Sequence, residues 1–122
     1  MDKAQALYDF WASFGLPAYD ETNIPDDAVM PYITYNTVTD SIDNVVPLSG
    51  SIWYRSTSWA EISHKSDEIA KKVAEHGYYI TTAQNGYLWL TKGQPFAQRI
   101  ANEDRSVRQI YINITGEFLT SY

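Results

Sequence analysis

Two histidines are the side chains of this chain that could act as bases near neutral pH. His64 is followed at three and four positions by Asp67 and Glu68, a spacing that puts all three on one face of a helix. A histidine beside carboxylates can shuttle a proton or supply half of a metal site. An exposed histidine among helical charges is usually only solvated, and His76 is expected at a helix C-terminus, where its ring suits the dipole. Neither histidine predicts catalysis.

A cluster of carboxylates raises the question of a calcium site. Asp20, Glu21, Asp26 and Asp27 fall within eight positions, in a stretch punctuated by prolines. They lack the alternating Asp/Asn spacing and the glycine of a known calcium loop. The pattern is typical of a solvated loop over residues 16 to 30, and we predict no metal there.

Other chemistry has no visible apparatus in the sequence. The chain has no cysteine, and it contains no G-x-S-x-G elbow, phosphate-binding glycine loop or H-E-x-x-H pattern. Two carboxylates could converge for glycoside hydrolysis, but nothing favours a particular pair. The Asn113-Ile114-Thr115 sequon lies in an expected strand of a chain without a secretion signal, so we discount it. We expect no enzymatic activity and no cofactor.

Composition limits the classes of partner. The 122 residues suit one domain spanning 1–122, and 15 acidic against 9 basic side chains give a net charge of −6. That charge disfavours DNA binding, and Lys71-Lys72 is only a pair. Neither a signal peptide nor an apolar run of membrane-spanning length is visible, so we expect synthesis in the cytoplasm and no membrane. Ten Tyr and four Trp suit protein–protein contacts or a tyrosine-rich sheet, which are not exclusive.

The first half of the chain predicts a helix and two strands. Residues 2 to 14 form an amphipathic helix capped by Asp2 and stopped at Gly15, and its apolar face is expected on the domain's own sheet rather than on a neighbouring subunit. That face comprises Ala4, Leu7, Tyr8, Trp11 and Phe14. Strands over 32–38 and 45–57 are expected to pair antiparallel.

The second half predicts a longer helix and three strands. Ser58 and Glu61 fit a capping box that opens a helix ending near His76, with Gly77 as its left-handed cap. Its buried stripe is Trp59, Ile62, Ser66, Ile69, Ala70 and Val73, and its surface pairs are Glu61–Lys65 and Glu68–Lys72.

Three strand candidates follow this helix. An Asn85-Gly86 turn predicts a hairpin of strands 78–82 and 87–91, and a polar connection over 92–105 leads to an alternating strand over 107–115. The fold class is therefore α+β: a mostly antiparallel sheet of about five strands, a long helix on one face and an N-terminal helix.

Part of this pattern resembles a known protein family. Ile24-Pro25-Asp26-Asp27 leads into Met30-Pro31-Tyr32-Ile33-Thr34-Tyr35, and Ser51-Ile52-Trp53-Tyr54-Arg55 leads into Ser58-Trp59 and the capped helix. The stretch from 16 to 76 resembles the tail terminator, or head-to-tail joining, proteins in the neck of long-tailed bacteriophages. The final strands resemble them only in type.

The resemblance implies a virion structural protein. Members form a ring, hexameric in this family, that caps the tail tube and meets the head connector or stopper protein, while DNA passes through the lumen without specific binding. It implies a location in the virion after assembly in the host cytoplasm, and no catalytic residue.

The sequence also leaves a candidate interface. Residues 39 to 50 are long, polar and expected to be unneeded for a compact core, so we expect them to extend toward a neighbouring subunit or the tail tube. The interface candidates are Thr39, Asp40, Ser41, Ile42, Asp43, Asn44, Val45, Val46, Pro47 and Leu48. Two alternatives remain open, namely another phage structural component, such as a minor capsid or connector protein, and a small protein-binding module.

Overall fold

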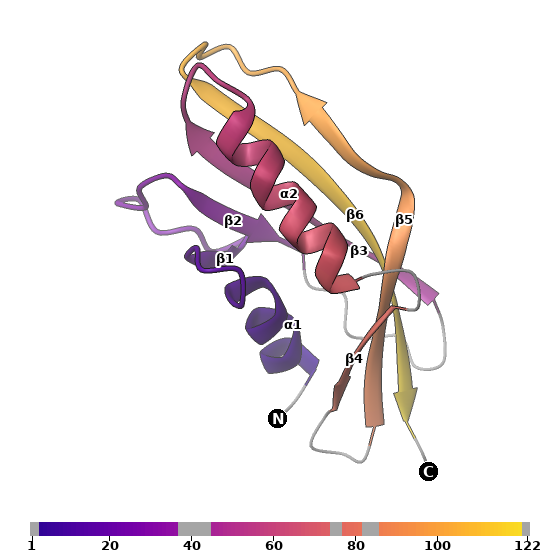
Figure 1. Cartoon of the computed structure of the whole chain (residues 1–122). Helices are drawn as coiled ribbons and strands as arrows, with labels where there is room; N and C mark the ends of the chain where they lie inside the picture. Colours follow the sequence, from indigo (N-terminus) through magenta and orange to yellow (C-terminus); the bar gives the residue numbers. More distant parts are fainter. Residues whose placement is uncertain (1–2, 37–44, 74–76, 82–85, 121–122) are drawn as a thin grey trace.

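Two helices and a twisted sheet make up the computed structural model, which describes residues 3–36, 45–73, 77–81 and 86–120. The helices are α1 (Lys3–Ala12) and α2 (Ala60–Val73). The strands are β1 (Ala18–Asp20), β2 (Tyr32–Tyr35), β3 (Val45–Arg55), β4 (Tyr78–Thr81), β5 (Gly86–Ile100) and β6 (Val107–Thr120). The sheet order is β1-β2-β3-β6-β5-β4, in which β1 pairs parallel with β2 and every other pair is antiparallel (Figure 1). The predicted α+β class is confirmed.

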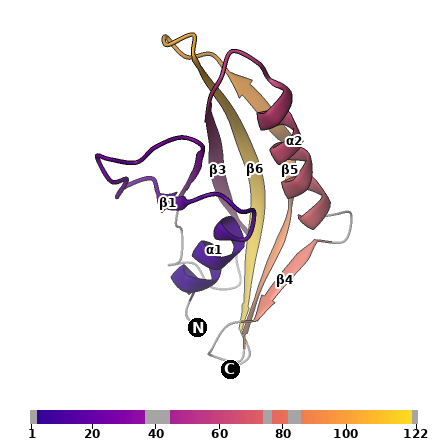
Figure 2. The same cartoon turned by 60° about the vertical axis from the view of Figure 1, so that its left-hand side comes forward.

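Long central strands carry the core. Ile110, Ile112 and Ile114 of β6 are buried, whereas the residues between them are half-exposed, which confirms the predicted alternation. These isoleucines pair in register with Ile52, Gly50 and Leu48 of β3, so one face of the sheet is continuously apolar. Both helices contribute side chains to the same buried cluster and therefore cover this one face (Figures 1 and 2). The opposite face carries no helix among the described elements.

The N-terminal helix packs on its own sheet, as expected. Leu7, Trp11 and Phe14 are buried, as predicted. Tyr8, which was also predicted to be buried, is 44% exposed, and Phe10 is buried instead. Phe10 meets Trp11 and Phe14 edge to face, with ring centroids 5.1 and 5.3 Å apart, which turns the helix toward that side. Asp2 lies outside the described residues, while Gly15 has a φ of +82°, as a helix stop requires.

The cap of α2 differs from the predicted box. The Ser58 hydroxyl accepts from the backbone N–H of Ala60 at 3.1 Å, not from that of Glu61, and the N–H of Ser58 donates to the Ser56 hydroxyl at 3.0 Å. Ser56 therefore accepts the hydrogen bond from the Ser58 N–H that the predicted capping box assigned to Glu61. The buried stripe is confirmed at Ile62, Ser66, Ile69 and Val73, whereas Trp59 and Ala70 are half-exposed.

Lysines join the two helices. Lys65 Nζ donates to the carbonyl of Phe14 at 2.7 Å and pairs with Glu68 at 3.1 Å, where the sequence predicted a pair with Glu61. Lys72 Nζ donates to the Ser13 hydroxyl at 2.5 Å. The end of α1 and one side of α2 are thus tied together. Residues 74–76 lie outside the described part, and Gly77 has the expected left-handed φ, +84°.

Two stretches predicted as loops contain strands. The predicted loop over 16–30 holds β1, which is only three residues long and was hidden between two prolines. The predicted connection over 92–105 is wrong in its first part, because β5 continues to Ile100. Its pairing with β6 shifts register between Lys92 and Ala97, and this irregularity accommodates Pro95, which cannot donate to a ladder. Polar residues and a proline made this strand read as a loop.

Gly50 sets the distance between α1 and the sheet, and its replacement tests the packing. A Cβ there would lie 2.9 Å from the Trp11 ring and 3.0 Å from the Thr34 carbonyl oxygen. Alanine gains about 0.5–1 kcal/mol over glycine from backbone entropy, but overpacking against a fixed backbone costs about 1–3 kcal/mol. We expect Gly50→Ala to lower the free energy of unfolding by about 1–2 kcal/mol in urea denaturation. The neighbouring Ser49→Ala should change it by less than about 0.5 kcal/mol; equal effects would contradict the close approach.

Candidate interaction surface

The structure describes one of the two histidines that the sequence singles out. His64 is exposed on α2, and His76 lies outside the described residues. No cluster of three or more His, Cys, Asp or Glu side chains is placed to hold a metal ion among the described residues. In the same part of the chain, no helix is long and apolar enough to cross a membrane.

A shallow hollow lies next to His64 on the helix side. Its volume is about 370 Å³, and it is lined by Tyr54, Ala60, Glu61, His64, Lys65 and Glu68. Burial raises the pKa of the Tyr54 phenol, and the Glu61 and Glu68 carboxylates raise it further. Tyr54 is therefore a neutral hydrogen-bonding group near pH 7, which suits recognition more than proton transfer.

Hydrogen bonds order the start of the acidic loop. The Asp20 carboxylate accepts from the backbone N–H of Thr22 at 2.9 Å and from its hydroxyl at 2.6 Å. This Asx turn ends β1 and satisfies one carboxylate oxygen locally. Further along the loop, Ile24 and Val29 are exposed, Val29 by 78%. The loop thus presents apolar side chains beside Asp26 and Asp27.

The predicted interface divides into two parts. Residues 39–44 lie outside the described part of the chain, so that portion stays a prediction. Val45, Val46, Pro47 and Leu48 belong to β3 and pair with β6 from Glu117 to Ile114. Leu48 is 1% exposed and Gly50 touches Trp11, so the expectation that residues up to 50 are unneeded for the core is wrong. The alternating Leu48, Gly50 and Ile52 signal a buried strand face that Pro47 and Gly50 obscured.

All four arginines of the chain lie near one end of the sheet. Their positions in the sequence, 55, 99, 105 and 108, did not predict this arrangement. We call Arg55, Arg99, Arg105 and Arg108 the arginine end. Arg55 closes β3, pairs with Asp104 at 3.4 Å and donates to Ser106 at 3.0 Å. The hydrogen bonds from Ser106, followed by the bond and charge of Arg55, lower the pKa of Asp104. The fold therefore brings together a cationic cluster that is not visible as a run of basic residues in the sequence.

Trp59 holds two of these arginines in place. The guanidinium carbons of Arg99 and Arg108 lie 4.6 and 5.2 Å from its ring centroid. Arg108 is committed to the backbone, since it donates to the carbonyl of Thr57 at 2.7 Å and to that of Arg105 at 3.0 Å. Arg99 is exposed, so it is better placed to meet an anionic group.

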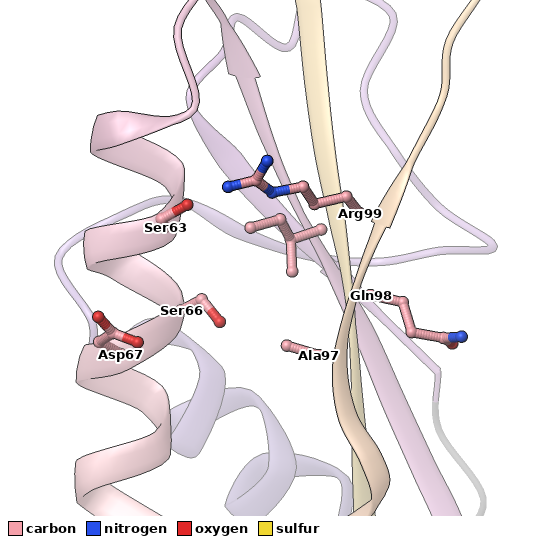
Figure 3. A pocket seen from close by; sticks show the side chains of 7 residues that line it. Ser63, Ser66, Asp67, Ala97, Gln98 and Arg99 are labelled. Atoms are coloured by element: carbon pink, nitrogen blue, oxygen red, sulfur yellow. The ribbon is translucent and has the colours of Figure 1, made fainter.

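A second hollow, of about 200 Å³, separates α2 from β5 beside Arg99. Ser63 and Ser66 of α2 face Ala97 and Arg99 of β5 across it, while Gln98 points away (Figure 3). Asp67 also belongs to the lining. Ile110 of β6 is also part of the lining. Strand β4 pairs with β5 only from Tyr87 to Leu90, so the outer edge of β5 beyond Leu90 has no strand partner among the described elements. Residues 97–100 are exposed there, whereas Ile110 and Ile112 of the neighbouring β6 are buried.

Comparison with known proteins gives one structural match to report. A chain in the solved structure of the virion of a native gene transfer agent particle superposes with a TM-score of 0.61 and 14% identity, over 94% of this chain and 92% of that chain. The fold is shared almost end to end. No protein-family model and no curated protein matches the sequence.

The electrostatics of the Tyr54 hollow can be tested by titration. Removing one negative charge beside a phenol makes ionisation easier, so Glu61→Gln should lower the pKa of Tyr54. Because the folded pKa lies above that of the unfolded chain, the Tyr54 contribution to stability is present below the unfolded value and declines as pH rises through the folded one. Tyrosine-labelled NMR, assigned with Tyr54→Phe, measures the pKa. The matched variant Glu103→Gln should leave it unchanged, and an unchanged value in Glu61→Gln would contradict the described geometry.

Proposed function

We propose that this protein is a structural component of a phage-like virion, acting at the junction of head and tail as a tail terminator. The observation that supports this most is the shared fold, which spans nearly the whole of this chain and of a chain in a gene transfer agent virion. The resemblance of residues 16 to 76 to tail terminator proteins points the same way. In this proposal the protein has a structural and not a catalytic role.

The proposed state is a ring of identical subunits, hexameric by resemblance, on the end of the tail tube and below the head connector. Aromatic residues on the helix-free face fit such contacts. Tyr19, Tyr32 and Trp53 form a row, with centroids 5.7 and 6.4 Å apart between neighbours. Tyrosine and tryptophan are enriched in interfaces because one ring provides both apolar area and a polar tip.

DNA would pass such a ring without being held. The net charge is −6, so the average field of the protein repels a phosphate backbone. The positive charge of the arginine end is offset in part, because Arg55 pairs with Asp104 and Arg108 donates to backbone carbonyls. We therefore assign its remaining charge to contacts with protein.

The first experiment measures assembly. Mass photometry and negative-stain microscopy of the purified protein, alone and mixed with tail tubes of the particle that encodes it, should show rings or tubes capped at one end. The alternative virion roles, a minor capsid or connector component, predict a different subunit number or binding to head rather than tail parts. A monomer that binds neither heads nor tails would overturn the proposal and favour a small binding module.

A deletion tests the predicted interface. Removing Thr39–Asn44 shortens the connection between β2 and β3 and keeps every residue of β3 in the sequence. We expect a folded monomer with impaired ring formation, measured by size exclusion and thermal melting. The control replaces the same six residues by Gly and Ser, which keeps the length and removes the side chains. Unchanged assembly in both variants would remove these residues from the interface.

A further inference from the structure

The open edges of the sheet have complementary features. The β5 edge, which we define as the outer side of Ala97–Ile100, lies at one side of the sheet, and β1 forms the opposite margin. A sheet edge presents backbone N–H and C=O groups that can pair with another strand. We infer that the β5 edge of one copy of this chain pairs with β1 of a second copy, joining the two sheets. This inference deepens the proposed ring and rests on it for its biological setting.

The backbone groups at both edges point outward at matching positions. Ile33 N–H donates to the Pro17 carbonyl and Glu21 N–H donates to the Tyr35 carbonyl, so Pro17 and Glu21 are directed toward β2. Alternation along the strand then directs the groups of Ala18 and Asp20 away from β2, toward the margin. One of them, the Asp20 carbonyl, also accepts from Asn23 N–H at 2.9 Å in the turn.

The same alternation can be followed across the sheet to β5. Asn36 N–H donates to the Ser49 carbonyl, so these two residues are a hydrogen-bonded pair of β2 and β3. When the alternation is followed through the registers of β2–β3, β3–β6 and β5–β6, Gln98 and Tyr111 are also a hydrogen-bonded pair. The backbone groups of Ala97 and Arg99 are therefore directed away from β6. Two outward-directed residues on β5 thus match two on β1.

The side chains of the outward-directed residues on both edges lie on the same face of the sheet. Ala18 is buried on the helix side, and Asp20, two positions on, shares that side. Arg99 and Ala97 are opposite the buried Ile110 and Ile112 and also face the helix side (Figure 3). The antiparallel register that pairs both outward residues of β1 with both outward residues of β5 puts Asp20 diagonal to Arg99. Opposite charges at such cross-strand positions are favourable.

Strand direction and length are compatible with the junction. Counting along the pairings, β1 runs antiparallel to β5. A second copy rotated about an axis along the strands therefore presents β1 antiparallel to the β5 edge, the simpler ladder. β1 has three residues, and the β5 edge has four beyond the irregularity at Lys92–Ala97. That irregularity and Pro95 disfavour pairing on the earlier part of β5, so the junction is short.

Because the chain has no cysteine, single cysteines can report the contact. Glu21 and Gln98 are both exposed and are brought close by the proposed pairing. Glu21→Cys and Gln98→Cys proteins are mixed and treated with a short bis-maleimide. We expect a cross-linked dimer in the mixture and not in either protein alone, because the contact joins two different surfaces. The matched control mixes Gln98→Cys with Lys71→Cys, an exposed site on the outer side of α2, and should not cross-link.

Two further variants test the mechanism in the Gln98→Cys background. Arg99→Glu replaces attraction by repulsion and should lower the association constant about tenfold. Ala97→Pro removes an outward N–H without removing a bond to β6, and should abolish the cross-link while thermal melting shows a folded chain.

Each outcome decides the inference. Cross-linking of Gln98→Cys with itself would mean that the edge pairs symmetrically and would overturn it. Rings in the microscope with no cross-link in the mixture would overturn this contact but keep the proposed function. A protein that is monomeric at every concentration and gives no cross-link would overturn the contact and count against the ring.

Discussion

The close approach of Trp11 to Gly50 is the contact on which the arrangement of the domain depends. The Trp11 ring lies over the backbone of β3 and stacks on Tyr35 of β2 at 6.2 Å, so α1 is fixed across two strands at once. Lys65 and Lys72 then tie α2 to the residues that end α1. Both helices consequently share one face of the sheet, and the margins and the helix-free face are left for contacts with other molecules.

The helix-free face carries hydrogen-bonded polar side chains beside its aromatic row. Trp53 Nε1 donates to the Thr34 hydroxyl at 3.0 Å, and the Gln109 amide donates to the Ser51 hydroxyl at 2.9 Å. Such cross-strand hydrogen bonds order the side chains without strong attraction for ions. The loop after β1 carries the acidic side chains Glu21, Asp26 and Asp27, whereas the arginines lie at the arginine end. This separation of charge favours contacts between unlike surfaces of neighbouring copies over contacts between like ones.

Much of the fold was predictable from the sequence because local signals agreed with the final packing. The alternating isoleucines of β6 and the apolar stripe of α2 follow from periodicity. The antiparallel pairing of β4 with β5 was also predicted, whereas residues 82–85 between them lie outside the described part. Sequence failed where tertiary pairing overrides local preference. β1 is too short to show a period, and the polar, proline-containing end of β5 is a strand only because β6 supplies its ladder. The interaction surface was harder still, since four arginines spread over 54 positions meet only after β3, β5 and β6 align.

The stacking of Arg99 and Arg108 on Trp59 couples parts of the chain that the sheet alone would leave independent. Trp59 immediately precedes α2, Arg99 stands on the outermost long strand, and Arg108 begins the central one. The indole thus ties the residue before α2 to both strands, and Lys65 ties the middle of the helix to a residue that follows α1. The first turn of α2 is therefore anchored to the sheet by stacked guanidinium groups as well as by its apolar stripe.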